Sequence, residues 1–218
     1  MRFVTFGCSI TYGEGLADCV SKNRQWAGPK PSDMSWAALL AKQYNFELAN
    51  YAKPGISNYH IAHQIQGFDW QQDDVALILF TFFHRYTIFD SGILPFNITP
   101  HDVNVHSKMH RAKAFYELFD NEHLVLNDTL SIDSSFYCLA YHQVPVIARF
   151  VGDIQRETYL EHTRVKDNEW LDLISKNDFL NHKVDIGLDK GEHPGPETHR
   201  LFAESLVEDV DNIINMRE

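Results

Sequence analysis

The chain is poor in cysteine and in long apolar runs. Its 218 residues include only Cys8, Cys19 and Cys138, an odd number without CxxC spacing, which excludes a disulfide scaffold and favours a reducing compartment. No stretch approaches the roughly 18 apolar residues of a membrane helix, and the N-terminal MRFVTFGCSIT is broken at Gly7 before it could form a signal-peptide core. We therefore expect a cytoplasmic protein with no membrane partner.

Clustered positive charge and nucleotide motifs are also missing. Nineteen Lys and Arg against thirty Asp and Glu give a net charge of −11, without the basic run of a nucleic-acid binder. The absence of GxGxxG and GxxxxGK[ST] gives no support for a bound nucleotide, and the absence of GxSxG excludes the α/β hydrolases with a mid-chain serine. Neither a cofactor nor a nucleic-acid partner is expected.

Apolar runs typical of strands alternate with segments of helical periodicity. The run VALILFTFF is apolar on both faces, as in a central parallel strand covered by helices. The alternation predicts one three-layer α/β/α domain over residues 1–218, with a mostly parallel sheet and a loop-rich insertion at about 85–110. The expected strands cover 2–6, 46–50, 75–83 and 144–151; the expected helices cover 32–44, a segment capped by Ser57 or Asn58, 112–116, 130–139, 155–173 and 196–214.

Candidate functional residues follow the expected strands. In an open parallel sheet, ligands bind beyond the carboxyl ends of the strands. Ser9 follows the first strand, Gly55 the second and His84 the third, while His193 precedes the last helix. A serine needs an imidazole to remove its proton and N–H donors to hold the oxyanion. We predict Ser9 as nucleophile, His193 as base, and the N–H groups of Ser9 and Gly55 as oxyanion donors.

These residues resemble the blocks of the SGNH (GDSL-type) hydrolases. Gly7-Cys8-Ser9 stands where the family has Gly-Asp-Ser, and GCSITYGEGL is similar to a subgroup in bacterial and phage genomes with Cys at the Asp position. Asn50 and Gly55 match the second block, and His193-Pro194 matches the last. The resemblance implies the SGNH fold and cofactor-independent hydrolysis of an acyl ester, with Ser9 and His193 in the catalytic roles.

Two blocks depart from that pattern. The third block, Gly-x-Asn-Asp in the family, is replaced here by residues ending in His84-Arg85, so His84 is our candidate for a third oxyanion donor, with Arg85 as an alternative. The family acid stands three residues before the histidine, a position held here by Lys190. We take Asp189 as the acid; Glu192 and a site without an acid are the alternatives.

The expected substrate is an acyl ester of a small molecule or carbohydrate, so that the protein would be an esterase or O-deacetylase. Tyr12, Asn58 and Arg85 are the predicted substrate-binding residues. The oligomeric state is left open.

Two other functions remain as alternatives. The departures from the family pattern allow a weak or inactive hydrolase-like carbohydrate-binding or assembly module. The pairs His60/His63 and His106/His110 have metal-ligand spacing, although neither forms an HExxH motif, and no metal is expected.

Overall fold

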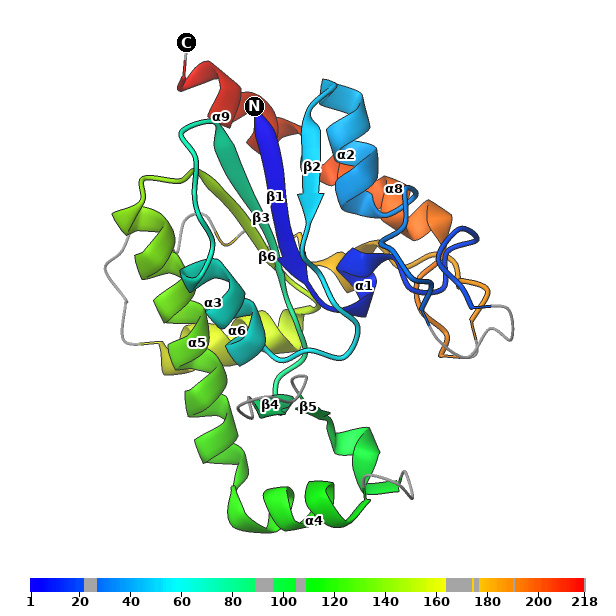
Figure 1. Ribbon diagram of the computed structural model, residues 1–218, viewed down its shortest axis with the longest axis vertical. Coiled ribbons are helices and arrows are strands. Elements are labelled where there is room, and N and C mark those ends of the chain that lie inside the picture. The colour runs from blue at the N-terminus through cyan, green and yellow to red at the C-terminus, as the bar shows by residue number, and fades with distance from the viewer. Residues whose placement is uncertain are drawn as a thin grey trace.

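The computed structural model describes residues 1–21, 27–88, 96–104, 109–163, 174, 177–189 and 191–217. Within them the chain forms an α/β fold around a parallel four-stranded sheet of order β2-β1-β3-β6 (Figure 1). The strands are β1 (Arg2–Gly7), β2 (Glu47–Asn50), β3 (Asp74–Phe80) and β6 (Val146–Phe150). The predicted α/β class with a parallel sheet is confirmed.

Strand β3 occupies the middle of the sheet because it is buried along its whole length and pairs with β1 and β6. It is shorter than the predicted 75–83, because the N–H of Thr81 donates to the Asn58 side chain at 2.8 Å after the ladder ends at Phe80. The ends of β1 and β3 are level, with Gly7 opposite Leu79. The segments that follow these strands therefore start at the same edge of the sheet.

Helices cover both sides of the sheet (Figure 1). On one side, Trp36 of α2 (Trp36–Tyr44) packs edge-on against Phe202 of α8 (Pro196–Ser205), with ring centroids 5.3 Å apart. On the other side lie α3 (Asn58–Gln66), α5 (Asn121–Tyr141) and α6 (Asp153–His162). The short α1 (Ser9–Tyr12) begins directly after β1, and α9 (Val207–Asn215) is the last helix.

Two of the helix predictions differ from the structure, and a third extends beyond the described residues. Helix α2 begins at Trp36 with Ser35 as its cap, because the side chain of the expected start, Ser32, bonds to Asp18 instead. The C-terminal helix is divided into α8 and α9 at the buried Leu206. In the expected helical region 155–173, α6 ends at His162, and residues 164–173 lie outside the described part.

The segment expected to be a loop-rich insertion contains regular structure. It forms an antiparallel pair, β4 (Tyr86–Ile88) and β5 (Phe96–Ile98), the short helix η1 (Pro100–Asn104) and α4 (Met109–Leu118). These elements lie beyond one end of the sheet (Figure 1) and enclose a second, small apolar cluster that includes Ile98 and Phe115. Residues 89–95 and 105–108 of this segment are outside the described part.

No helix in the described ranges combines the length and the apolar character needed to cross a bilayer.

Candidate active site

Ser9 is the first residue of α1 and lies at the carboxyl end of β1. Cys8 precedes the helix in an extended conformation, and its thiol is fully buried. The Ser9 side chain is itself largely buried, and its Oγ lies 3.0 Å from Nε2 of His193. The first N–H groups of a helix have no partner within it, so those at the start of α1 are not used by bonds inside the helix.

His193 and Asp189 lie on the loop before α8. The His193 Nδ1 is 2.7 Å from Asp189 Oδ2, which makes Nδ1 the protonated nitrogen and leaves Nε2 able to accept the Ser9 proton. The Asp189 carboxylate also accepts hydrogen bonds from the N–H groups of Gly191 and His193. Burial works to raise the pKa of Asp189, but these bonds and the nearby imidazole hold it below its ordinary value. Ser9, His193 and Asp189 thus form one continuous chain of hydrogen bonds.

Gly15 lies against Asp189, a contact that the sequence did not predict. Its φ of +91° favours glycine, and a Cβ there would lie 2.6 Å from Asp189 Oδ1. The Gly15 carbonyl accepts a 2.7 Å hydrogen bond from the N–H of Leu188, which ties the loop after α1 to the acid-bearing loop. The second glycine of the Gly13-Glu14-Gly15 string was the available indication in the sequence.

Glu14 is a second unpredicted carboxylate at the site. Its Oε2 is 3.7 Å from His193 Nε2, and its side chain is 13% exposed. Burial raises the pKa of Glu14, while the neighbouring His193 works against that rise. This carboxylate lies on the side of the imidazole that faces Ser9, opposite the nitrogen that bonds to Asp189.

Gly55 lies in the turn after β2, which is held beside the end of β1. The N–H of Lys53 donates to the Gly7 carbonyl at 3.1 Å, and the Asn50 amide donates to the Thr11 carbonyl at 3.3 Å. Gly55 has a φ of +77°, and a Cβ there would meet no atom within 4 Å. Its conformation therefore needs glycine, while the space beside it is open.

The residues after β3 are fixed by a buried polar network. The Asp128 carboxylate accepts hydrogen bonds from the Asn58 amide at 3.0 Å and from the backbone N–H of His84 at 2.9 Å. Burial raises the pKa of Asp128 to about 7, although both hydrogen bonds act in the opposite direction. His84 adopts a left-handed conformation with φ +66°, and its carbonyl accepts from Tyr116. The backbone N–H of His84, one possible oxyanion donor, is therefore already engaged.

Two of the predicted substrate-binding residues have other partners. Asn58 is fully buried and bonds to Thr81 and Asp128 through both ends of its amide. The Tyr12 hydroxyl donates to the Gly28 carbonyl at 2.8 Å. Both side chains serve to hold loops in place, and neither lines the cavity at Ser9.

A cavity of about 300 Å³ opens beside Ser9 and His193. Arg85, the third predicted substrate-binding residue, lines this cavity. Apolar wall is contributed by Ile10, Phe82 and Leu180. The cavity thus combines the Ser9 hydroxyl, the His193 imidazole and an apolar wall.

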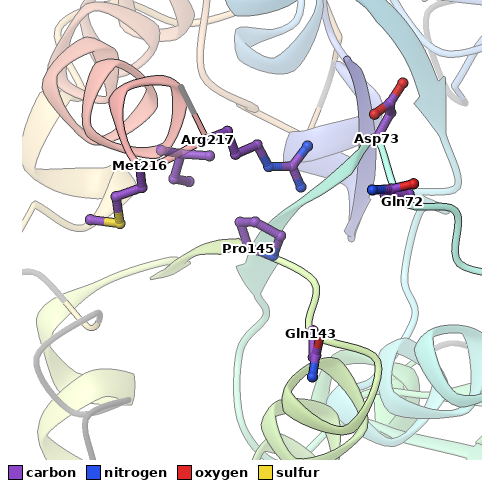
Figure 2. Close-up of a pocket in the computed structure, with 7 residues that line it drawn as sticks. Gln72, Asp73, Gln143, Pro145, Met216 and Arg217 are labelled. Atoms are coloured by element: carbon purple, nitrogen blue, oxygen red, sulfur yellow. The ribbon is translucent and has the colours of Figure 1, made fainter.

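A larger cavity of about 470 Å³ lies elsewhere, at the amino ends of the strands (Figure 2). Asp73 and Pro145, which precede β3 and β6, line it together with Arg217. Among the described residues its lining contains no serine, cysteine or histidine, whereas Ser9 and His193 line the smaller cavity.

In the described part of the chain, no group of three or more His, Cys, Asp and Glu side chains is arranged to hold a metal ion. His60 and His63 lie on α3, whereas His106 of the second histidine pair is outside the described residues.

The fold and site geometry define an α/β protein with the SGNH hydrolase fold, in which a serine, a histidine and an aspartate meet at the carboxyl edge of the sheet. By sequence, no protein-family model and no curated protein matches the chain.

Solved structures of similar fold are esterases and G-D-S-L proteins. One is a carbohydrate esterase whose active site displays divergent catalytic and non-catalytic binding functions, 11% identical over 97% of this chain, with a TM-score of 0.63. Another is the acetyl xylan esterase Est2A from the rumen bacterium Butyrivibrio proteoclasticus, 14% identical over 100% of this chain, with a TM-score of 0.60. This chain spans 64% of the length of each.

A third structure is comparable in length. It is a member of the lipolytic protein G-D-S-L family from Veillonella parvula, 16% identical over 95% of this chain and 97% of its own, with a TM-score of 0.53. At sequence identities of 11 to 16%, the similarity of this chain to these structures is a similarity of fold.

Proposed function

We propose that the protein is a cofactor-independent serine hydrolase that cleaves acyl esters. The observation that carries the proposal is the hydrogen-bonded series of Ser9, His193 and Asp189, with distances of 3.0 and 2.7 Å. A buried serine that donates to an imidazole oriented by a carboxylate is the arrangement that activates a hydroxyl for attack on a carbonyl.

In the proposed mechanism, His193 Nε2 takes the Ser9 proton as Oγ attacks the ester carbonyl. The N–H groups of Ser9 and Gly55 hold the negative charge that develops on the carbonyl oxygen. The imidazolium, stabilised by Asp189, then protonates the departing alcohol and leaves an acyl group on Ser9. Water, deprotonated by His193, hydrolyses this acyl-enzyme and restores the serine.

The proposed substrate is an O-acyl ester on a carbohydrate or a small molecule, which makes deacetylation one candidate reaction. Two structural neighbours support this class, since one is described as a carbohydrate esterase and the other as an acetyl xylan esterase. The cavity of about 300 Å³ beside Ser9 is sufficient for a short acyl chain or part of a sugar.

The experiment is mass spectrometry after incubation with a fluorophosphonate, using the wild type, Ser9→Ala and His193→Ala. We expect one adduct on Ser9 in the wild type and none in either variant, while Ser134→Ala on α5 keeps the adduct. Circular dichroism shows that each protein is folded. A folded wild type that forms no adduct contradicts the proposal.

The second candidate is a hydrolase-like carbohydrate-binding module with little or no turnover. It is favoured by the loop after β3, where His84 stands at the place of the family asparagine and gives its N–H to Asp128. Binding of a glycan by a folded wild type that shows neither adduct nor hydrolysis would support this candidate over the first.

A further inference from the structure

Arg85 lines the cavity at Ser9 and forms no ion pair with a described carboxylate, although Glu14 and Asp128 lie near enough to interact with its charge. Its Nη1 donates to Thr81 Oγ1 at 3.0 Å, and its guanidinium carbon lies 4.8 Å from the centre of the Phe82 ring. Among the described residues, no carboxylate lies within ion-pair distance of Arg85. By contrast, Arg2, Arg149, Arg156 and Arg200 each pair with an aspartate or glutamate.

The lack of an ion pair to Arg85 among the described residues is unexpected in a chain with a net charge of −11, where carboxylates greatly outnumber cations. The hydroxyl of Thr81 and the ring of Phe82 fix the plane of the guanidinium while occupying few of its N–H groups. A fixed planar guanidinium is suited to bidentate binding of a carboxylate.

Other side chains of the cavity define the kind of ligand. Lys183, which follows η2 (Phe179–His182), adds a second positive charge to the lining. Glu192 is the acidic residue of the lining and is exposed, whereas Leu180 and Ile10 supply apolar wall. Methylene groups between an ester and an anionic end would contact this wall.

We propose that Arg85 binds a carboxylate of the substrate, so that the enzyme prefers esters carrying one negative charge on the acyl or the alcohol side. The proposal rests on the ester hydrolysis proposed above. It assigns a substrate class to the cavity despite the acidic composition of the chain, because the lining holds the two positive side chains of Arg85 and Lys183 beside the one acidic side chain of Glu192.

Two pairs of esters test whether the enzyme prefers a charged substrate and whether the charge belongs on the acyl or the alcohol side. The acyl-side pair is mono-4-nitrophenyl adipate and 4-nitrophenyl hexanoate; the alcohol-side pair is 4-acetoxybenzoate and 4-acetoxybenzamide. We expect the wild type to favour the charged member of one pair in kcat/KM. Replacing Arg85 by glutamine should lower that charged-to-neutral ratio by about tenfold or more, the usual worth of a hydrogen-bonded charge.

Arg200→Gln is the matched control, because Arg200 is an exposed arginine on α8 that pairs with Glu197 and Glu204. Its ratios should equal those of the wild type, and Arg85→Lys should recover part of the preference. Ratios that are the same in wild type and Arg85→Gln for both pairs overturn the proposal.

A binding measurement separates this proposal from the proposed catalysis. Titration calorimetry measures the affinity of adipate and of 4-hydroxybenzoate for Ser9→Ala, with and without Arg85→Gln. A decrease of about tenfold in the affinity for either ligand on loss of Arg85 supports the carboxylate site even where no ester is hydrolysed. The absence of binding to Ser9→Ala, or equal binding to both proteins, overturns it.

Discussion

The backbone and the ring of His193 both bond to the Asp189 carboxylate. The ring Nδ1 lies 2.7 Å from one oxygen, and the backbone N–H lies 3.2 Å from the other. The acid therefore fixes the imidazole and also the loop that carries it, so Nε2 is directed at Ser9 before any substrate arrives.

We expect Asp189→Asn to slow fluorophosphonate labelling of Ser9 by roughly 10⁴-fold, since an amide cannot hold the imidazole in the same tautomer or stabilise its charge. The rate is measured by mass spectrometry over time. Glu192→Gln is the control, because Glu192 is the neighbouring acid and makes no ion pair with His193 among the described residues. Slower labelling in Glu192→Gln than in Asp189→Asn would assign the acid to Glu192.

Gly15→Ala should reduce activity by displacing the acid. The new Cβ would lie 2.6 Å from Asp189 Oδ1, at a residue whose φ is +91°. We expect a lower unfolding temperature and slower labelling of Ser9. In the control Gly67→Ala, at the end of α3, the nearest atom to the new Cβ is 3.4 Å away and φ is −90°. Unchanged labelling in Gly15→Ala would mean that the acid tolerates displacement.

Glu14→Gln should change the pH dependence of hydrolysis. Burial raises the pKa of Glu14, and its carboxylate lies 3.7 Å from His193 Nε2, so a second titratable acid stands beside the proposed base. Removing this titratable group should change the acidic limb of the kcat/KM profile. The profile is measured on 4-nitrophenyl acetate, with the exposed Glu161→Gln as control. An acidic limb at the same pH in both variants contradicts an electrostatic role for Glu14.

Asp128→Asn should make stability less dependent on pH. Burial raises the pKa of Asp128 from 3.8 to about 7, so the folded protein binds more protons than the unfolded chain between these values. The stabilisation by protonated Asp128 is complete below the unfolded pKa and is lost as the pH rises through the folded one. Between about pH 4.5 and 7.5, the fall in the free energy of unfolding should therefore be smaller in the variant.

Urea unfolding at both pH values checks this prediction, with Asp69→Asn as the exposed control. The pKa of Asp178 is also raised to about 7, chiefly by burial, so the comparison of wild type with variant isolates Asp128. An equal pH dependence in the wild type and Asp128→Asn would show that Asp128 does not titrate in this range.

The sequence is a good guide to the elements of the sheet and a weaker one to the ends of helices. The apolar run around β3 and the cap at Ser57 depend on nearby residues, so local patterns predict them. The start of α2 depends instead on the contact of Ser32 with Asp18 across 14 positions. The division of the last helix at Leu206 follows from burial of that side chain, which periodicity does not specify.

At the site, the order of serine, glycine and histidine along the chain predicts a set of interacting groups, and the fold brings Ser9, His193 and Asp189 together. The partner of Asn58 could not be predicted, because Asp128 is 70 positions away in the middle of an otherwise ordinary helix. Glu14 was missed for a similar reason. Its neighbour His193 comes from the far end of the chain.

Ser9 and His193 are separated by 184 positions in the sequence. Their hydrogen bond needs β1, the loop before α8 and the sheet between them to be in place at once. In the proposed mechanism, Ser9 therefore lacks its base during synthesis until residue 193 has left the ribosome and the domain has folded. The extent to which a covalent serine probe labels Ser9 in the purified protein would then measure the fraction of folded molecules.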